Sequence, residues 1–452
     1  MLRRAALFAG VARRASNAAA ATTGAAGRKL APASVPVSAG SSSAPAQALQ
    51  VEDETVQLSG HGLLPVTNRL KIVDTQALER WPVFRVMGSD GKLLPDADPI
   101  PSELTEDKVV GMYKTMVRVQ SLDDIFYNAQ RQGRISFYMQ NAGEEATHVG
   151  SACALSKDDV VLAQYREVGV LLHRGFSLQQ AADQCFSNES DLGKGRQMPV
   201  HYGSKEHNFQ TISSPLATQL PQAVGAAYAL KLAGKSAIAM CYFGEGAASE
   251  GDFHAALNFS ATLEAPVVFF CRNNGYAIST PTRDQFRGDG IVSRAAGYGV
   301  HGVRVDGNDA FAVYMACKAA RALAVEKNAP VIVEAMSYRR GHHSTSDDST
   351  RYRSMAEIKH WQDHLDPVGR LRAYIKGQGW WSDEQEQQLR DSERVEVLQC
   401  LERAERKPKP DIEELFNDVY AGPGLPPHLA RQREELLEHM AQHPAHYRSG
   451  DH

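Results

Sequence analysis

The chain has 452 residues, of which 43% are hydrophobic and 23% are charged, as is usual for a globular protein. Its 49 Lys and Arg nearly balance its 53 Asp and Glu, and the body of the chain has no long basic run, which argues against binding to nucleic acid or an anionic membrane. No apolar run approaches the roughly 18 residues that a membrane-spanning helix needs. The six cysteines are scattered without a CxxC pair, which predicts buried free thiols in a reducing compartment.

The first 50 residues differ in composition from the rest. They contain no acidic residue, while arginine, serine and alanine are frequent and a long apolar core is lacking. This pattern predicts an organelle transit peptide and a disordered leader over residues 1–50, mitochondrial in preference to plastid. A disordered tail without a targeting role is the alternative interpretation.

Three further regions follow from the pattern of the remaining chain. Residues 51–101 are rich in proline and glycine from Gly60 onward, which predicts an extended arm. Residues 102–395 are predicted to form an α/β domain, and residues 396–452 a helical C-terminal segment. The arm and the last helix, predicted at 428–442, are expected to cover a partner.

Strands and helices alternate through the predicted domain. Strands are expected at 158–167, 236–243, 266–274, 303–307 and 330–339, and helices at 105–132, 213–234, from 249 onward and at 310–325. Pro221 lies inside the second of these helices and is expected to kink it. The alternation predicts a mostly parallel sheet with helices on both faces, which is a doubly wound α/β fold.

Polar residues follow three of the predicted strands, at 164–166, 244–246 and 272–274. Parallel strands joined by one helix end at the same edge of a sheet, where α/β proteins bind their ligands. Glu245 and Asn274 can therefore meet, and a carboxylate with an amide oxygen suits Mg²⁺. In the simpler alternative, Glu245 only closes a tight turn at a helix N-terminus.

The surroundings of Glu245 favour an anionic ligand. Gly244, Gly246 and Ala247 leave main-chain N–H groups uncovered, and such groups attract anions at the start of a helix. Arg166 and Arg272 stand at strand ends, where guanidinium groups can bind phosphate through two nitrogens. We therefore interpret this edge of the sheet as a site for a metal-bound pyrophosphate.

Longer stretches of the sequence carry a family resemblance. They are "TISSPLATQLPQAVGAAYA", "CYFGEGAASEGD", "CRNNGYAISTP" and "YRRGHHSTSDDSTRYRS". A glycine–acid–glycine triplet followed by Asn-Asn resembles the thiamine-diphosphate motif. From about Pro65 to the C-terminal helix, the chain resembles the alpha subunits of branched-chain 2-oxoacid dehydrogenases, within the thiamine-diphosphate-dependent 2-oxoacid dehydrogenase family. The pyruvate dehydrogenase alpha subunits are similar but differ in the metal loop and the histidine loop.

The resemblance implies a set of site residues. For Mg²⁺ they are Glu245, Asn274 and the backbone of Tyr276, and for K⁺ they are Ser213, Pro215, Thr218 and Gln219. For thiamine diphosphate they are Gln164, Tyr165, Arg166, Ser214, Gly244, Gly246, Ala247, Arg272 and His343.

The segment around the two adjacent histidines is interpreted separately. His342 and His343 have no cysteine beside them, so they make a poor zinc site. The resemblance implies that His343 is catalytic, as a phosphate contact and as a proton donor during transfer to lipoamide. It also implies phosphorylation at Ser344 and Ser354. A phosphate brings nearly two negative charges, which should repel the pyrophosphate and disorder the loop.

By the same resemblance, the chain is one part of a larger enzyme. It implies oxidative decarboxylation of branched-chain 2-oxoacids in the mitochondrial matrix, with transfer of the acyl group to the lipoyl arm of a transacylase core. Glu144 and Glu145 are candidates for the glutamate that activates the coenzyme, but they have the character of first-turn helix carboxylates. The resemblance implies that this glutamate comes from a beta subunit in an α2β2 heterotetramer. A regulatory kinase and phosphatase are also implied. A pyruvate or acetoin dehydrogenase alpha subunit and a non-catalytic regulatory subunit are the alternatives.

Overall fold

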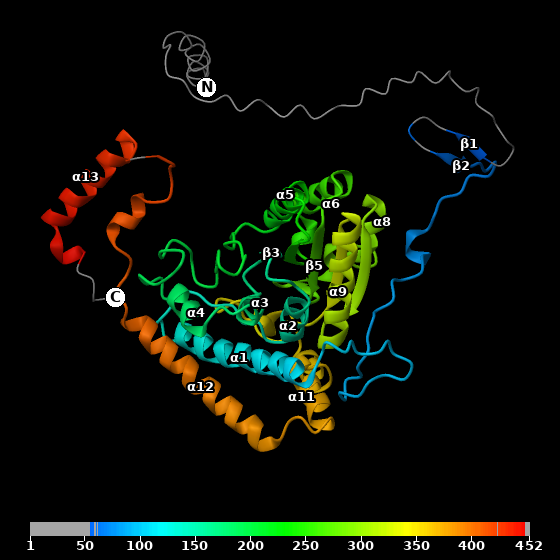
Figure 1. Cartoon of the computed structure of the whole chain (residues 1–452), viewed down its shortest axis with the longest axis horizontal. Helices are drawn as coiled ribbons and strands as arrows, with labels where there is room; N and C mark the ends of the chain where they lie inside the picture. Colours follow the sequence, from blue (N-terminus) through cyan, green and yellow to red (C-terminus); the bar gives the residue numbers. More distant parts are fainter. Residues whose placement is uncertain (1–54, 58–59, 61, 423, 448–452) are drawn as a thin grey trace, which may run out of the picture. The chain divides into compact units, whose positions relative to one another are not determined.

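The computed structural model describes residues 55–57, 60, 62–422 and 424–447, so the predicted leader at 1–50 lies outside the described residues. Backbone contacts divide the chain into two units, Met1–Val73 and Asp74–His452. In the first unit, strands β1 (Thr55–Gln57) and β2 (Leu63–Pro65) pair in antiparallel fashion (Figure 1). The second unit contains the rest of the fold.

The second unit is built around a five-stranded parallel sheet with the order β3-β4-β5-β9-β8. The strands are β3 (Val160–Leu162), β4 (Ala239–Gly244), β5 (Val267–Asn273), β8 (His301–Asp306) and β9 (Val331–Met336). Every pairing in this sheet is parallel. The prediction of a doubly wound α/β fold with a parallel sheet is confirmed.

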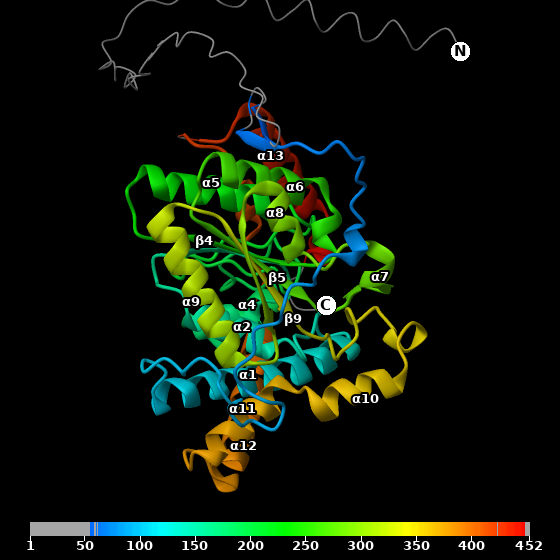
Figure 2. The same ribbon diagram turned by 90° about the vertical axis from the view of Figure 1, so that its right-hand side faces the viewer.

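Helices cover both faces of this sheet, as Figure 2 shows. Helices α5 (Gln219–Leu232) and α6 (Gly251–Thr262) lie over one face, and α2 (Glu145–Cys153) and α9 (Ala310–Lys327) lie over the other. Successive side chains of a strand point to opposite faces. Tyr242 accordingly belongs to the apolar core beneath α2 and α9, and the neighbouring Phe243 to the core beneath α5 and α6. Both faces are buried, as a parallel sheet requires.

The remaining elements pack around this centre. They are α1 (Glu106–Arg131), α3 (Val168–His173), α4 (Leu178–Cys185), β6 (Tyr276–Ala277), β7 (Thr280–Pro281), α7 (Thr282–Gln285), α8 (Ala295–Tyr298), α10 (Met355–His364), α11 (Pro367–Gly377), α12 (Asp383–Arg406) and α13 (Pro427–Gln442). Short 3₁₀ turns are η1 (Thr75–Ala77), η2 (Ala247–Ser249), η3 (Val292–Arg294), η4 (Ser349–Arg351), η5 (Ile412–Phe416) and η6 (Pro444–His446). Helix α12 contacts α1 and α4. The predicted boundary between residues 395 and 396 falls inside this continuous helix.

Two predicted elements differ from the structure near the sheet edge. Helix α5 begins at Gln219, so residues 213–218 form a loop instead of the predicted first helical turns. Pro221 is then the third residue of α5, where the amide has no intrahelical partner in any case, and the predicted kink has no cause. Strand β3 is also shorter than predicted, and 164–166 follow it as a loop.

Part of the predicted arm packs on the second unit itself. Phe84 forms a parallel bridge with Val305 of β8. The Asp309 carboxylate accepts hydrogen bonds from the amides of Val86 (2.9 Å) and Met87 (2.8 Å), and it also caps α9. These contacts attach residues 84–87 firmly to the core.

Two expectations from composition can be compared with the structure. All six cysteines are buried and free, which confirms the prediction of free thiols. In the part of the chain that the structure describes, we find no helix with the length and apolar character needed to cross a membrane.

Candidate active site

The structure brings the three polar strand ends together at one edge of the sheet. Strands β4 and β5 pair with Gly244 opposite Arg272, which places Glu245 beside Asn274. The backbone N–H of Asn274 donates to Glu245 Oε2 at 3.3 Å. Gln164, which follows β3, accepts a hydrogen bond from the Gly244 amide at 2.7 Å. The predicted meeting of distant residues at this edge is therefore present.

Glu245 has the properties of a cation ligand. Its side chain is buried, and its Oε1 atom has no hydrogen-bond partner among the described residues. Burial raises the pKa of Glu245 to about 7. A buried carboxylate oxygen without a partner is costly, and a hard cation would remove that cost. Asn274 Oδ1, which accepts from the Tyr276 amide at 3.2 Å, lies in the same turn. The oxygen donors therefore suit Mg²⁺.

The glycine turn after β4 leaves little room for side chains. A Cβ atom on Gly246 would lie 2.7 Å from the Cβ of Ala277, so only glycine is accommodated without a shift. The turn continues as the 3₁₀ helix η2, and α6 begins only at Gly251. The sequence predicts these amides at the start of the helix. The structure instead places the amides of Gly246 and Ala247 in a tight turn before α6.

Two buried carboxylates that sequence reasoning had not placed in this site hold Arg272. Its guanidinium bonds to Glu144 at 2.5 Å and also to Glu167. Although burial opposes the charge, these two carboxylates raise the pKa of Arg272. Glu144 is the N-cap residue of α2, and it also accepts from Asn274 Nδ2 at 2.8 Å. The acid directly after Arg166 and the Glu-Glu pair in "NAGEEATHVG" were the available signals, but their distance from β5 in the sequence concealed the contact.

Arg166 is held by main-chain oxygens. Its guanidinium donates to the carbonyls of Gln140 and His343, the latter at 2.8 Å. Both arginines that we predicted as phosphate ligands are thus bound to protein groups in the structure. They are buried beside the strand ends, and their assignment to the coenzyme stays a prediction.

His343 is neutral and its proton position is set by a neighbour. Burial, together with Arg166 and Arg339, lowers its pKa to about 3. Arg339 Nη1 lies 3.2 Å from His343 Nδ1, and a guanidinium can only donate, so Nδ1 accepts and Nε2 carries the hydrogen. The ring also meets the Tyr165 ring edge-on at 5.9 Å between centroids. The neutral ring can therefore donate a hydrogen bond from Nε2, and its role as a proton donor stays a prediction.

His342 has a different role. Its Nδ1 accepts a hydrogen bond from the Ser349 amide at 3.0 Å, which ties the loop back on itself. Among the described residues, no group of three or more His, Cys, Asp or Glu side chains is arranged to hold a metal. His342 thus acts as a structural residue of the loop.

The loop after His343 is closed by Asp347. One carboxylate oxygen of Asp347 accepts from the His343 amide at 2.7 Å and from the Tyr352 hydroxyl at 2.6 Å. Ser344 Oγ accepts from the Ser346 amide at 3.2 Å. Ser354 is the N-cap of α10, where its hydroxyl accepts from the Glu357 amide at 3.1 Å. The two predicted phosphorylation sites therefore stand at a loop turn and at a helix start.

The loop before α2 contacts residues 338–340, which lie just before the two histidines. Gly143 has a φ of 94°, and a Cβ there would collide with the carbonyl oxygen of Tyr338. The Arg340 amide donates to the Ala142 carbonyl at 2.9 Å. The backbones of 142–143 and 338–340 are therefore in contact with no side chain between them.

The predicted potassium loop lies before α5. Thr218 Oγ1 donates to the Pro215 carbonyl at 3.2 Å, and the Gln219 side chain donates from Nε2 to the Tyr242 carbonyl in β4 at 3.0 Å. Ser213 is exposed in the same loop. This loop precedes α5 and is not part of its regular hydrogen-bond pattern. The Ser214 hydroxyl lies 2.9 Å from His201 Nε2. These residues share one loop, and their part in binding K⁺ or coenzyme stays a prediction.

Glu145, the neighbour of Glu144, lies outside this network and gives a test of stability. Its carboxylate accepts from the Gly143 amide (2.9 Å) and Gln120 (3.3 Å), and burial raises its pKa to about 7. Because the folded-state pKa lies above the unfolded one, its contribution to folding is fully present below pH 4.5 and is lost as the pH rises through 7. We expect Glu145→Gln to recover up to about 3 kcal/mol at pH 7.5. In thermal denaturation the gain should shrink as the pH falls towards 4.5, and an equal gain at both pH values would contradict this.

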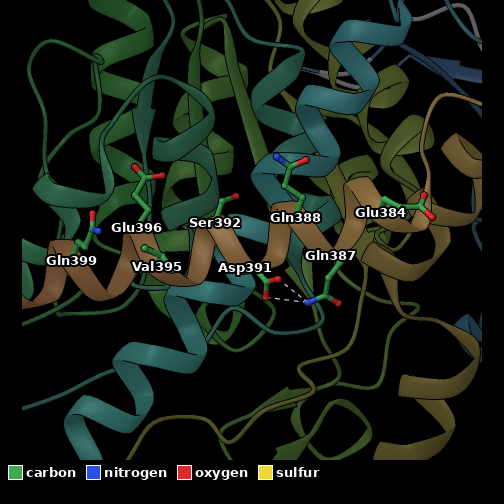
Figure 3. A pocket seen from close by; sticks show the side chains of 8 residues that line it. All are labelled: Glu384, Gln387, Gln388, Asp391, Ser392, Val395, Glu396 and Gln399. Atoms are coloured by element: carbon green, nitrogen blue, oxygen red, sulfur yellow. Dashed lines mark hydrogen bonds between the residues drawn. The ribbon is translucent and has the colours of Figure 1, made fainter.

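A wide hollow occurs elsewhere, on the outward face of α12 (Figure 3). It has a volume of about 900 Å³ and is open to solvent. Its lining consists of α12 residues alone: Glu384, Gln387, Gln388, Asp391, Ser392, Val395, Glu396 and Gln399. None of these residues belongs to the site at the ends of β3, β4 and β5.

The chain is similar to known proteins over most of its length. The family model described as dehydrogenase E1 component matches residues 113–413. The mitochondrial 2-oxoisovalerate dehydrogenase subunit alpha of Homo sapiens is 55% identical over 381 residues, which cover 84% of each chain. Subunit alpha 1 of Arabidopsis thaliana is 51% identical over 403 residues (89% of this chain and 84% of the other), and the Dictyostelium discoideum protein is 52% identical over 384 residues (84% and 85%). The chain therefore belongs to the dehydrogenase E1 component family.

Proposed function

We propose that this chain is the alpha subunit of a mitochondrial enzyme that oxidatively decarboxylates branched-chain 2-oxoacids with thiamine diphosphate. The dehydrogenase E1 component family depends on this coenzyme, and the relatives quoted above are named for 2-oxoisovalerate. Their names also state a mitochondrial location, which supports the mitochondrial matrix for this chain.

One observation carries the proposal, namely the unpaired Oε1 of buried Glu245 next to Asn274. In our assignment these two side chains and the Tyr276 carbonyl hold Mg²⁺. In the same assignment, the turn at Gly246 and Ala247 would contact the pyrophosphate together with Arg166, Arg272 and His343. Potassium would be held by Ser213, Pro215, Thr218 and Gln219.

The chemistry divides between the coenzyme and the chain. Thiamine diphosphate supplies the electron sink that allows the 2-oxoacid to lose CO₂. The chain anchors the coenzyme and excludes water at a buried edge. Neutral His343 can donate a hydrogen bond from Nε2 to an anionic oxygen, while Arg339 fixes the ring from the other side. Arg166, bonded to the His343 carbonyl, holds the same residue in place.

The proposal includes partners. Glu144 is bonded to Arg272 and Asn274, and Glu145 to Gly143, so neither carboxylate is free to contact a coenzyme ring. A beta subunit would then supply the activating glutamate in an α2β2 assembly, and a lipoyl-bearing transacylase core would accept the acyl group. A kinase and a phosphatase acting on Ser344 and Ser354 would regulate it.

Two measurements on the chain co-purified with a beta subunit test this function. Calorimetry should show binding of thiamine diphosphate that requires Mg²⁺, and the complex should decarboxylate 2-oxoisovalerate faster than pyruvate. Preference for pyruvate or acetoin would assign the chain to another 2-oxoacid dehydrogenase. Lack of metal-dependent binding would indicate a non-catalytic subunit.

A further inference from the structure

Glu144 bonds through its side chain to both Arg272 and Asn274, which lie at and just after the end of β5. One oxygen, Oε1, accepts from Asn274 Nδ2 at 2.8 Å, and the other, Oε2, accepts from Arg272 Nη1 at 2.5 Å. The side chain is fully buried. The Arg272 guanidinium and the Asn274 NH₂ group both donate to it, so both oxygens of Glu144 act as acceptors in this arrangement.

An asparagine amide has two ends of nearly equal size, and only the oxygen can bind a cation. An ionised carboxylate cannot donate, so the end of Asn274 that faces Glu144 has to be the NH₂ group. The other end, Oδ1, is then turned towards the Tyr276 amide, at 3.2 Å in the same turn.

We propose that Glu144 is a positioning residue that fixes the Asn274 amide so that its oxygen is presented to the cation bound by Glu245. The inference rests on the proposed function and adds to it a residue of α2 that does not touch the metal. Arg272 has a part in this arrangement, because its ion pair holds the buried Glu144 carboxylate in place. Partners of this kind typically change metal affinity 10- to 100-fold when they are mutated.

The test is a titration of the assembled complex with Mn²⁺ in the presence of thiamine diphosphate, followed by electron paramagnetic resonance. Glu144→Gln should weaken Mn²⁺ binding by about 10- to 100-fold, because a neutral amide no longer requires the NH₂ end of Asn274. Asn274→Asp should also weaken it, because two carboxylates would then face each other at this place.

The double variant distinguishes positioning from a general structural role. In Glu144→Gln/Asn274→Asp, the new glutamine can donate its NH₂ to the aspartate and accept from Arg272, so the hydrogen-bond pattern is complete again. We expect its Mn²⁺ affinity to exceed that of both single variants. If both substitutions only damaged the structure, the double variant would lose at least as much Mn²⁺ affinity as the two single variants together. That outcome would overturn the inference.

Glu145→Gln is the matched control, since it removes a neighbouring carboxylate that is equally buried but has no bond to Arg272 or Asn274. Its Mn²⁺ affinity should stay within about twofold of the unmodified complex. Unchanged affinity in Glu144→Gln would refute the positioning role alone. Absence of Mn²⁺ binding in the unmodified complex would instead refute the proposed function. If Glu144→Gln does not assemble, the double variant decides, and it should bind Mn²⁺ more tightly than Asn274→Asp.

Discussion

Glu245→Gln should abolish the metal-dependent binding of thiamine diphosphate and reduce decarboxylation by at least about 100-fold, more than the loss expected from a residue that only supports a ligand. The substitution keeps the size of the side chain but replaces a charged oxygen with an amide that a hard cation binds poorly. Calorimetry with Mg²⁺ and coenzyme, on the chain assembled with its beta subunit, measures the effect directly.

The same turn offers a control for Glu245. Glu250 is exposed and lies five positions further on, so Glu250→Gln changes the net charge by the same amount without touching the sheet edge. It should retain binding and activity. Glu245→Gln should also melt no lower than the unmodified chain in the absence of metal, because it removes a buried carboxylate whose pKa is raised to about 7. Retention of metal-dependent binding by Glu245→Gln would contradict our assignment of the metal site.

Ser344→Glu should reduce the overall reaction with a lipoylated partner by roughly 10-fold or more, as expected when a catalytic group is moved out of position. The new carboxylate would stand in the turn that the Asp347 amide closes by donating to the Ser344 carbonyl at 3.1 Å. The Asp347 carboxylate accepts hydrogen bonds from the His343 amide and the Tyr352 hydroxyl. Repulsion between the two carboxylates should break these bonds and release His343 from the site. Activity assays and limited proteolysis of the 344–353 segment measure the two consequences together.

Two variants separate charge from loss of the hydroxyl. Ser344→Ala removes only the hydrogen bond from the Ser346 amide and should keep most of the activity. Ser346→Glu adds the same charge at an exposed position and should have a smaller effect. Full activity of Ser344→Glu, or an equal loss in Ser344→Ala, would contradict the mechanism.

The parts of the site that follow from strand order could be predicted from the sequence. Ile238 to Phe243 and Val267 to Asn273 are apolar runs separated by one helix, so their parallel pairing and the meeting of Glu245 with Asn274 followed from the general rules for such units. The helices on both faces of the sheet followed from the alternation of strands and helices. The buried free thiols followed from the scattered cysteines without a CxxC pair.

The parts that depend on tertiary contacts were not predicted. Glu144 comes from the start of α2, far from β5 in the sequence, and no local pattern links it to Arg272. The start of α5 was placed too early because 213–218 contains residues that a helix tolerates, whereas Ala217 adopts a φ of 68°. The bonds from Arg166 and Arg272 to protein groups were not predicted either, because a sequence does not show which groups a charged side chain contacts.

The close backbone contact at Gly143 has a consequence for regulation. We expect residues 142–144 and 338–340 to move together, since no flexible side chain separates them to absorb a displacement. The loop at 344–354 and Glu144 should then be thermodynamically linked, and linkage acts in both directions. Occupancy of the cation position should protect the loop from proteases, and a charge added to the loop should in turn speed release of the ion.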